Sequence, residues 1–160
     1  MRWAIFIGLC LILGGAFWAY GGYEIREEAP FYLKKMIGQT VTIELGNRQI
    51  EAEIAKTTAA KQKGLSFRDG LNSNRGMIFV YQNEVVLSFW MKDVNFPLDY
   101  IWVKDDVIID LTKNVLPDPG PIYRQYQPNA PVNRVIEVSA GFIDTAGLVI
   151  GQKIKFSKPL

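Results

Sequence analysis

The chain has 160 residues, with 18 lysines and arginines against 16 aspartates and glutamates, one cysteine and no histidine. A net charge of +2 gives no electrostatic basis for nucleic-acid binding, and we predict none. Without histidine the chain cannot form a Ser-His-Asp triad, a Cys-His pair or an ordinary zinc site. Its glycines form no phosphate loop or dinucleotide fingerprint, and we predict neither a cofactor nor a metal, although carboxylates and carbonyls remain as the ligands that a hard cation would use.

The chain begins with an uncharged run over residues 3–23, with aromatic residues at both ends. A helix over this run is about 30 Å long, the thickness of the hydrocarbon core of a bilayer. Aromatic rings favour the boundary between membrane and water. We therefore predict that residues 1–23 are a transmembrane anchor that contacts the lipid bilayer. A cleaved secretory signal is the alternative, because Gly14 and Ala16 are spaced like the small residues before a cleavage site.

The charges on the two flanks of this run predict its direction. Arg2 precedes the run, and the segment 24–28 that follows it is net acidic. Positive charge tends to stay in the cytoplasm, so we expect a single-pass protein of the cell membrane with a cytoplasmic N-terminus and an extracytoplasmic domain. Residues 24–38 are the expected juxtamembrane linker, with a short helix that either lies on the membrane surface or packs on the domain.

Residues 39–160 are predicted to form a single β-rich domain. Apolar and polar residues alternate over 40–45 and 48–54, and the intervening Gly46-Asn47 predicts a β-hairpin turn. A short helix follows over 57–63, with a threonine cap at its start and Gly64 at its end.

The remainder of the domain reads as short strands rich in valine, isoleucine and aromatic residues. Strands are predicted over residues 77–81, 85–92, 98–104, 107–113, 134–139 and 152–157. Five prolines make 115–133 a long irregular loop, and a helical turn is expected over 141–148. The predicted fold is a compact β-barrel or sandwich with short inserted helices.

Three segments together resemble a known family. They are Gly64-Leu-Ser-Phe-Arg68 with Gly76-Met-Ile-Phe79, Phe89-Trp-Met-Lys92 with Pro97-Leu-Asp99, and residues 135–141 with 147–151. In order and spacing they are similar to an uncharacterised prokaryotic family named domain of unknown function 192. The resemblance covers about residues 55–156 and implies a compact extracytoplasmic β-domain with no assigned activity.

One face of the strand expected over 85–92 is a candidate ligand-binding surface. Alternation puts Ser88, Trp90 and Lys92 on that face, and it puts the apolar residues between them in the core. A hydroxyl, a flat ring and a cation side by side suit a glycan or a small molecule. The alternative is that Trp90 packs in a second core layer while Lys92 extends to water.

Two acids lie within apolar strands and are the candidate catalytic residues, Asp99 and Glu137. A buried carboxylate is costly unless it is paired, and Arg68, Lys92 and Arg134 are available as partners. One interpretation is a structural ion pair. The other is a paired-carboxylate site, in which two acids at a workable separation cleave a glycoside. Arg68 is also a candidate ligand-binding residue.

The sequence therefore favours a membrane-anchored extracytoplasmic binding or accessory module, with an envelope glycan, a small molecule or a membrane protein as its partner. A carboxylate-based hydrolase acting on cell-envelope material is the second hypothesis. The third is a structural subunit of a membrane complex, docked through the anchor and the proline-rich loop.

Overall fold

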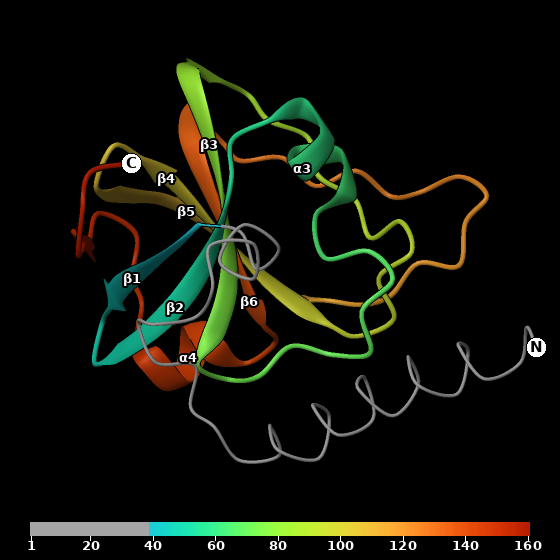
Figure 1. Ribbon diagram of the computed structural model, residues 1–160, viewed down its shortest axis with the longest axis horizontal. Helices are drawn as coiled ribbons and strands as arrows, with labels where there is room; N and C mark the ends of the chain where they lie inside the picture. Colours follow the sequence, from blue (N-terminus) through green and yellow to red (C-terminus); the bar gives the residue numbers. More distant parts are fainter. Residues whose placement is uncertain (1–38) are drawn as a thin grey trace, which may run out of the picture. The chain divides into compact units, whose positions relative to one another are not determined.

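The computed structural model describes residues 39–160, so the expected anchor and juxtamembrane linker lie outside the described residues (Figure 1). Within residues 39–160, no helix has the length and apolar character needed to span a membrane. The described part is mainly β, as predicted, and consists of one sheet of seven strands with two short helices. The sheet is curled into a half-barrel rather than split into a sandwich.

The strands and helices follow one another along the chain, with long loops before β3, β4 and β6. In chain order they are β1 (Thr40–Leu45), β2 (Arg48–Ala55), α3 (Thr58–Lys63), β3 (Arg75–Val85), β4 (Leu98–Lys104), β5 (Val107–Val115), β6 (Val132–Ser139), α4 (Phe142–Ala146) and β7 (Lys155–Phe156).

The strand order across the sheet is β5-β4-β6-β3-β2-β1-β7. Every pair is antiparallel except β2 and β3, which are parallel and therefore need a long crossover, supplied by α3 and the loop after it. The segment before β7 bonds to the far edge of the sheet, where the Val107 backbone pairs with Lys153. Two further hydrogen bonds join Ile108 to Gly151 and Gln152. These bonds join the two ends of the sheet and fix its curl.

The predicted first hairpin is confirmed, with Leu45 opposite Arg48 and Gly46-Asn47 as the turn. Gly46 has φ of +61°, and a Cβ placed on it would lie 2.1 Å from the carbonyl oxygen of Ala146. The Asn47 amide donates to that same oxygen at 3.2 Å. Glycine is therefore required here both for the backbone conformation and for the approach of the turn to α4.

Two hydrophobic cores cover the two faces of the sheet. The inner core joins residues from β1, which lies next to the edge strand β7, such as Ile43, with Ile108 of β5 at the other edge. Residues this far apart in the strand order meet only on the concave face. The second core, here called the loop-side core, packs Tyr100 and Trp102 of β4 against Phe89 and its neighbours in the connecting loops.

The prediction of a strand over residues 85–92 is wrong. Strand β3 continues to Val85, and after it the chain crosses the loop-side core with one isolated bridge, between Phe89 and Tyr126. The predicted alternation is nevertheless present, because Leu87, Phe89 and Met91 are buried. A chain that lies extended over a sheet buries every second side chain without joining the ladder, so period two does not distinguish the two arrangements.

The other predictions differ from the structure mainly at their ends. The first helix is confirmed as α3, in which the Thr57 hydroxyl accepts from the Ala60 amide at 3.1 Å and Gly64 forms the C-cap. The proline-rich segment is irregular up to β6, as predicted. The last two elements are shorter than expected, since the second helix spans only Phe142–Ala146 and β7 only Lys155–Phe156.

Candidate functional site

A row of side chains crosses the loop-side face of the sheet at its centre. Backbone register places Glu53 of β2 beside Met77 of β3, Met77 beside Glu137 of β6, and Glu137 beside Tyr100 of β4. Four neighbouring strands thus contribute one residue each to a line that includes two carboxyl groups and a phenol. Loops 64–74 and 86–97 contribute side chains to the core on this face.

Glu137 is buried within this row, with 5% of its surface exposed. Its Oε2 atom is buried and has no hydrogen-bond partner among the described residues. Burial raises the pKa of this carboxyl to about 8, and the nearby positive charge of Arg68 only partly offsets that effect. Glu137 is therefore predominantly protonated at pH 7, and it is a hydrogen-bonding group without a protein partner on Oε2.

Arg68 is committed to Glu53, a partner that the sequence did not indicate. Its Nη1 and Nη2 atoms donate to the two carboxylate oxygens of Glu53 at 2.6 and 2.9 Å. This bidentate pair lowers the pKa of Glu53, chiefly through the hydrogen bond. Arg68 thus fixes the loop after α3 onto β2. Its positive charge also lies near Glu137.

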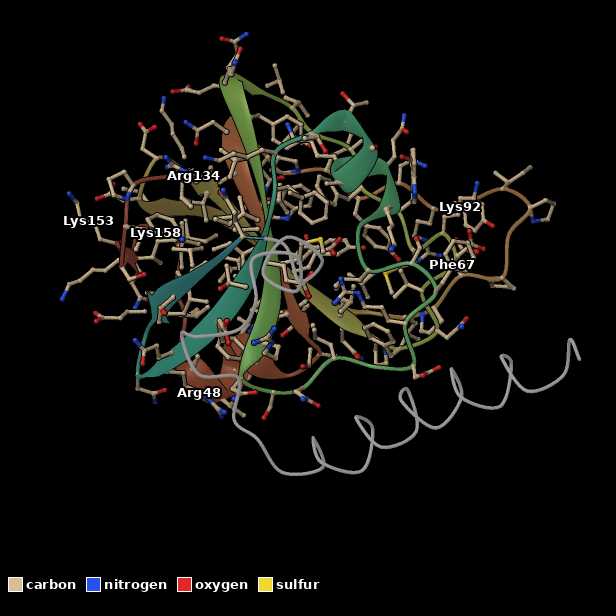
Figure 2. The ribbon with its side chains drawn as sticks, viewed as in Figure 1. Arg48, Phe67, Lys92, Arg134, Lys153 and Lys158 are labelled. Atoms are coloured by element: carbon tan, nitrogen blue, oxygen red, sulfur yellow. The ribbon has the colours of Figure 1, made fainter. Side chains whose placement is uncertain are left out.

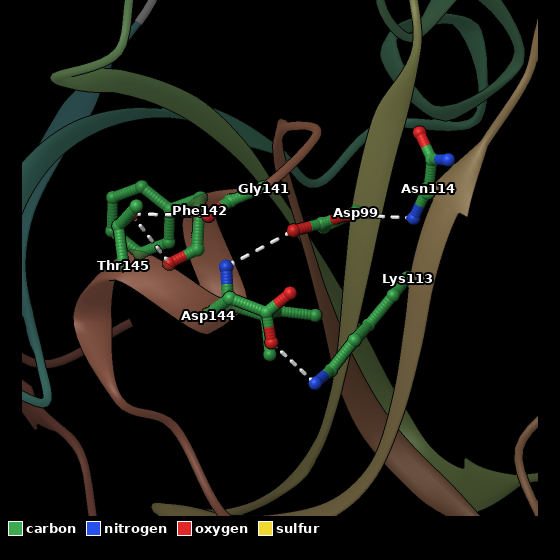
Figure 3. Close-up of polar contacts among 8 residues, drawn as sticks. Asp99, Lys113, Asn114, Gly141, Phe142, Asp144 and Thr145 are labelled. Carbon is green, nitrogen blue, oxygen red and sulfur yellow. Dashed lines mark hydrogen bonds and ion pairs between the residues drawn. The ribbon is translucent and has the colours of Figure 1, made fainter.

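Asp99 is buried on the opposite face of the sheet, where it accepts hydrogen bonds from two backbone amides (Figure 3). Its Oδ1 accepts from the Asn114 amide of β5 at 2.8 Å, and its Oδ2 accepts from the Ile143 amide in the first turn of α4 at 3.0 Å. Asp99 lies opposite Val138, an inner-core residue, whereas Glu137 lies opposite Tyr100 of the loop-side core. The structure therefore does not bring the two candidate catalytic acids together.

The three residues expected on a ligand-binding face are all exposed. Trp90 has 47% of its surface exposed, so it does not lie in a second core layer. The Ser88 hydroxyl donates to Oε1 of Gln125 in the proline-rich loop at 2.6 Å. Lys92 lies on the surface next to Phe67 (Figure 2). Phe67 belongs to the Gly-Leu-Ser-Phe-Arg segment but was not among the predicted site residues.

Phe67, Trp90 and Lys92 are exposed residues of two loops that are hydrogen-bonded to each other, and we call this set the aromatic surface. Phe67 has φ of +62° and is 77% exposed. Two hydrogen bonds of 2.8 Å hold its loop against the next one, from the Ser66 hydroxyl to the Lys92 carbonyl and from the Phe67 amide to the Asp93 carbonyl. A large apolar side chain held exposed in a left-handed backbone conformation is uncommon, and such strain is concentrated at functional positions.

The aromatic surface is connected to the buried row beneath it. The Tyr100 hydroxyl lies 3.0 Å from the Met91 sulfur and 3.5 Å from the Trp90 carbonyl oxygen. Arg68 joins Phe67 to Glu53 by the bidentate pair described above. Of the sequence candidates, Ser88, Trp90, Lys92, Arg68 and Glu137 thus belong to the loop-side half of the domain, and Asp99 does not.

The exposed side chains of this region offer surface contacts to a ligand. Among residues 39–160 there is no group of three or more acidic, histidine or cysteine side chains placed to hold a metal ion. Aromatic rings, a lysine ammonium and a hydroxyl offer stacking, charge and hydrogen bonding to a molecule laid across the surface.

Residues 40–156 match the model of the family DUF192, which is described only as "Uncharacterized ACR". No curated protein matches the chain. A crystal structure of a protein of unknown function from Novosphingobium aromaticivorans is similar, with a TM-score of 0.69, 27% identity, and coverage of 84% of this chain and 99% of that one. A putative transcription regulator from Sinorhizobium meliloti has the same TM-score at 21% identity, covering 75% of this chain and 95% of that one, and it supports the fold alone.

Proposed function

The chain belongs to the DUF192 family, and we propose that it is a membrane-anchored extracytoplasmic binding module that recognises an envelope glycan. The observation that carries the proposal is the aromatic surface, in which Phe67, Trp90 and Lys92 are all exposed. Single exposed apolar residues are ordinary, but two exposed aromatic residues and a lysine on two loops joined by hydrogen bonds offer a recognition surface. Because this surface is made of exposed side chains, it suits an extended ligand better than a small molecule, which needs a concave site.

The hydrolase hypothesis has less support than binding. A glycosidase needs two carboxyl groups within about 5–10 Å on the same side of one substrate. Asp99 has both carboxylate oxygens engaged by backbone amides on the inner face, away from Glu137. Glu53, the other acid of the buried row, has both carboxylate oxygens bound by Arg68, so Glu137 has no free acid partner and we do not propose catalysis.

The binding proposal is tested with the full-length chain in a neutral detergent, titrated with soluble muropeptides while intrinsic tryptophan fluorescence is recorded. Trp90→Ala and Phe67→Ala are each expected to weaken binding about tenfold or more, in line with the loss of an aromatic anchor. Ile150→Ala is the matched control, because Ile150 is also a large exposed apolar residue, with 61% of its surface exposed. Equal binding by all four proteins would refute the aromatic surface as the site.

If no muropeptide binds, the structural-subunit hypothesis takes precedence. One observation favours it, since Ile122 in the proline-rich loop is 91% exposed and Leu116 is 60% exposed. Cross-linking from Ile122→Cys to neighbouring membrane proteins would then identify the partner.

The proposal of a membrane anchor and of its orientation is based on the uncharged run over residues 3–23 and the charges on its two flanks. The described domain has no cysteine, and Cys10 lies within the run. Ser73 is exposed in the loop before β3, so Ser73→Cys introduces one reporter thiol. A membrane-impermeant maleimide is expected to label this variant in intact spheroplasts. Labelling only after the membrane is permeabilised would overturn the proposed orientation.

A further inference from the structure

A groove of about 700 Å³ opens beyond the ends of β2 and β3, beside the start of β6. It is lined by Lys56, Lys61, Val80, Tyr81, Gln82, Asn83, Val85, Asn133, Arg134 and Leu160. Neither the aromatic surface nor the buried carboxyl row contributes a residue to its wall. It is therefore a second surface feature, independent of the function proposed above.

The groove is positively charged. Three of its lining residues are cations, Lys56, Lys61 and Arg134, and no acidic side chain is among the described residues that line it. The neighbouring acids are already engaged. Glu84 pairs with Lys104 at 2.7 Å, and the Asp105 carboxylate accepts from the Asn133 side chain at 2.8 Å. The Asn133 amide is neutral, so the Asp105 carboxylate keeps its charge near the groove, but the residues that line the groove carry a net positive charge.

Two of the three cations are held in place by their contacts. The Lys61 ammonium lies 3.8 Å from the centre of the Tyr81 ring, and the guanidinium of Arg134 lies 5.3 Å from that of Phe156. Nη1 of Arg134 also donates to the Asp105 carbonyl. Contacts of this kind reduce the side-chain freedom that would be lost when an anion binds.

Arg134 has hydrogen-bonding capacity that the described residues leave unused. Its Nε is buried and has no hydrogen-bond partner. A buried, unpartnered donor on a fixed guanidinium is unusual, because nearly all such groups are satisfied in folded proteins. Because Nε is closed off from solvent, an anion in the groove meets the guanidinium at its terminal nitrogens, and the fork of an arginine matches carboxylate and phosphate geometry.

We propose that this groove is an anion-binding site, in which Arg134 and Lys61 bind a phosphate group of a ligand and Lys56 adds charge at the rim. Gln82 and Asn83 from the end of β3 offer amide groups to the polar atoms attached to that phosphate. The phosphate belongs either to a soluble molecule or to an anionic lipid headgroup, and the chemistry of recognition is the same for both.

The test is a titration of the full-length chain in neutral detergent with inorganic pyrophosphate, followed by amide chemical shifts in the segment 80–85. Arg134→Gln is expected to raise Kd about tenfold or more, as for loss of a charged hydrogen-bond donor. Lys56→Gln, at an exposed position, is expected to raise Kd about two- to fivefold, and it keeps the test valid if Arg134→Gln fails to fold.

Arg48→Gln is the matched control. Arg48 carries the same charge and makes a similar contact, 5.5 Å above the Phe142 ring. It begins β2, whereas Lys56 follows the end of that strand, and it lies at the other end of the domain from Arg134 (Figure 2). The Kd of Arg48→Gln for pyrophosphate is expected to equal that of the wild type. An equal loss in Arg48→Gln, or no saturable binding, would overturn the proposal.

The source of the phosphate is separated by repeating the titration in micelles that contain phosphatidylglycerol. Competition by the lipid, seen as a higher Kd for pyrophosphate in the wild type but not in Arg134→Gln, supports a lipid headgroup as the ligand. An unchanged Kd supports a soluble ligand. Shift changes that the lipid causes equally in wild type and Arg134→Gln would contradict a headgroup site in the groove.

Discussion

The buried carboxyl of Glu137 makes the stability of the domain depend on pH in a direction opposite to that of a paired acid. In the folded state burial raises its pKa to about 8, whereas its ordinary value in an unfolded chain is 4.5. Between these values the folded protein holds a proton that the unfolded chain has released. Raising the pH therefore destabilises the folded state across this window.

The expected magnitude follows from the size of the shift. The difference between 4.5 and about 8 is about 3.5 pH units, and each unit corresponds to about 1.36 kcal/mol. The stabilisation is fully present below pH 4.5 and is lost above pH 8, with a total change of about 5 kcal/mol. Between pH 5 and pH 8 the part that is measured is about 3.5 kcal/mol.

Glu137→Gln keeps the shape of the side chain but cannot ionise, so it removes this dependence. Urea unfolding of the full-length chain in neutral detergent gives the free energy of unfolding at pH 5, 6, 7 and 8. The variant is expected to gain about 3.5 kcal/mol relative to the wild type from pH 5 to pH 8. Glu84→Gln, which removes an acid of an exposed ion pair, is the control and should show no such trend.

A difference between Glu137→Gln and the wild type that stays constant within about 0.5 kcal/mol over this range would refute the reasoning. That result would mean that Glu137 is ionised in the folded protein and has a partner or a water that stabilises its charge.

Three further changes test the packing of the fold by urea unfolding. Phe89→Ala is expected to lower the free energy of unfolding by about 3–5 kcal/mol, because the Phe89 ring packs edge-on against three other aromatic rings at 4.8–5.8 Å. Phe67→Ala, at an exposed position, is the control and should change the free energy of unfolding by less than about 0.5 kcal/mol. Asp99→Asn is expected to lower the free energy of unfolding by about 1–3 kcal/mol, because the amide nitrogen of the asparagine would face one of the two backbone N–H donors. A variant as stable as the wild type would contradict the role of Asp99 in holding β5 and α4 together. Gly46→Ala should cost more than about 1 kcal/mol at its positive φ, while Gly70→Ala, with open space around it, should not destabilise.

The candidate site was predicted in part. Alternation correctly separated the exposed residues Ser88, Trp90 and Lys92 from the buried ones between them, because side chains of an extended chain alternate whether or not it joins a sheet. The partner of Arg68 was missed, since Glu53 lies in a hairpin strand that the sequence gives no reason to place under the loop. The exposure of Phe67 was also missed, because a positive φ at a non-glycine residue has no sequence signature.

The sequence by itself determined the local elements that depend on neighbouring residues. The hairpin turn at Gly46-Asn47, the threonine cap and glycine end of α3, and the β class of the domain all follow from such short-range preferences. The family followed from the order and spacing of three motifs along residues 64–151.

Only the tertiary structure decided which residues share a face and which partners they find. Asp99 and Glu137 both lie at buried strand positions, yet the pairing of β4 with β6 places them on opposite sides of one sheet. The cationic groove joins the ends of three strands from distant parts of the chain. Strand register pairs residues that are far apart in sequence, and a shift of one residue would move every side chain of a strand to the other face of the sheet. Local sequence patterns therefore do not determine the register.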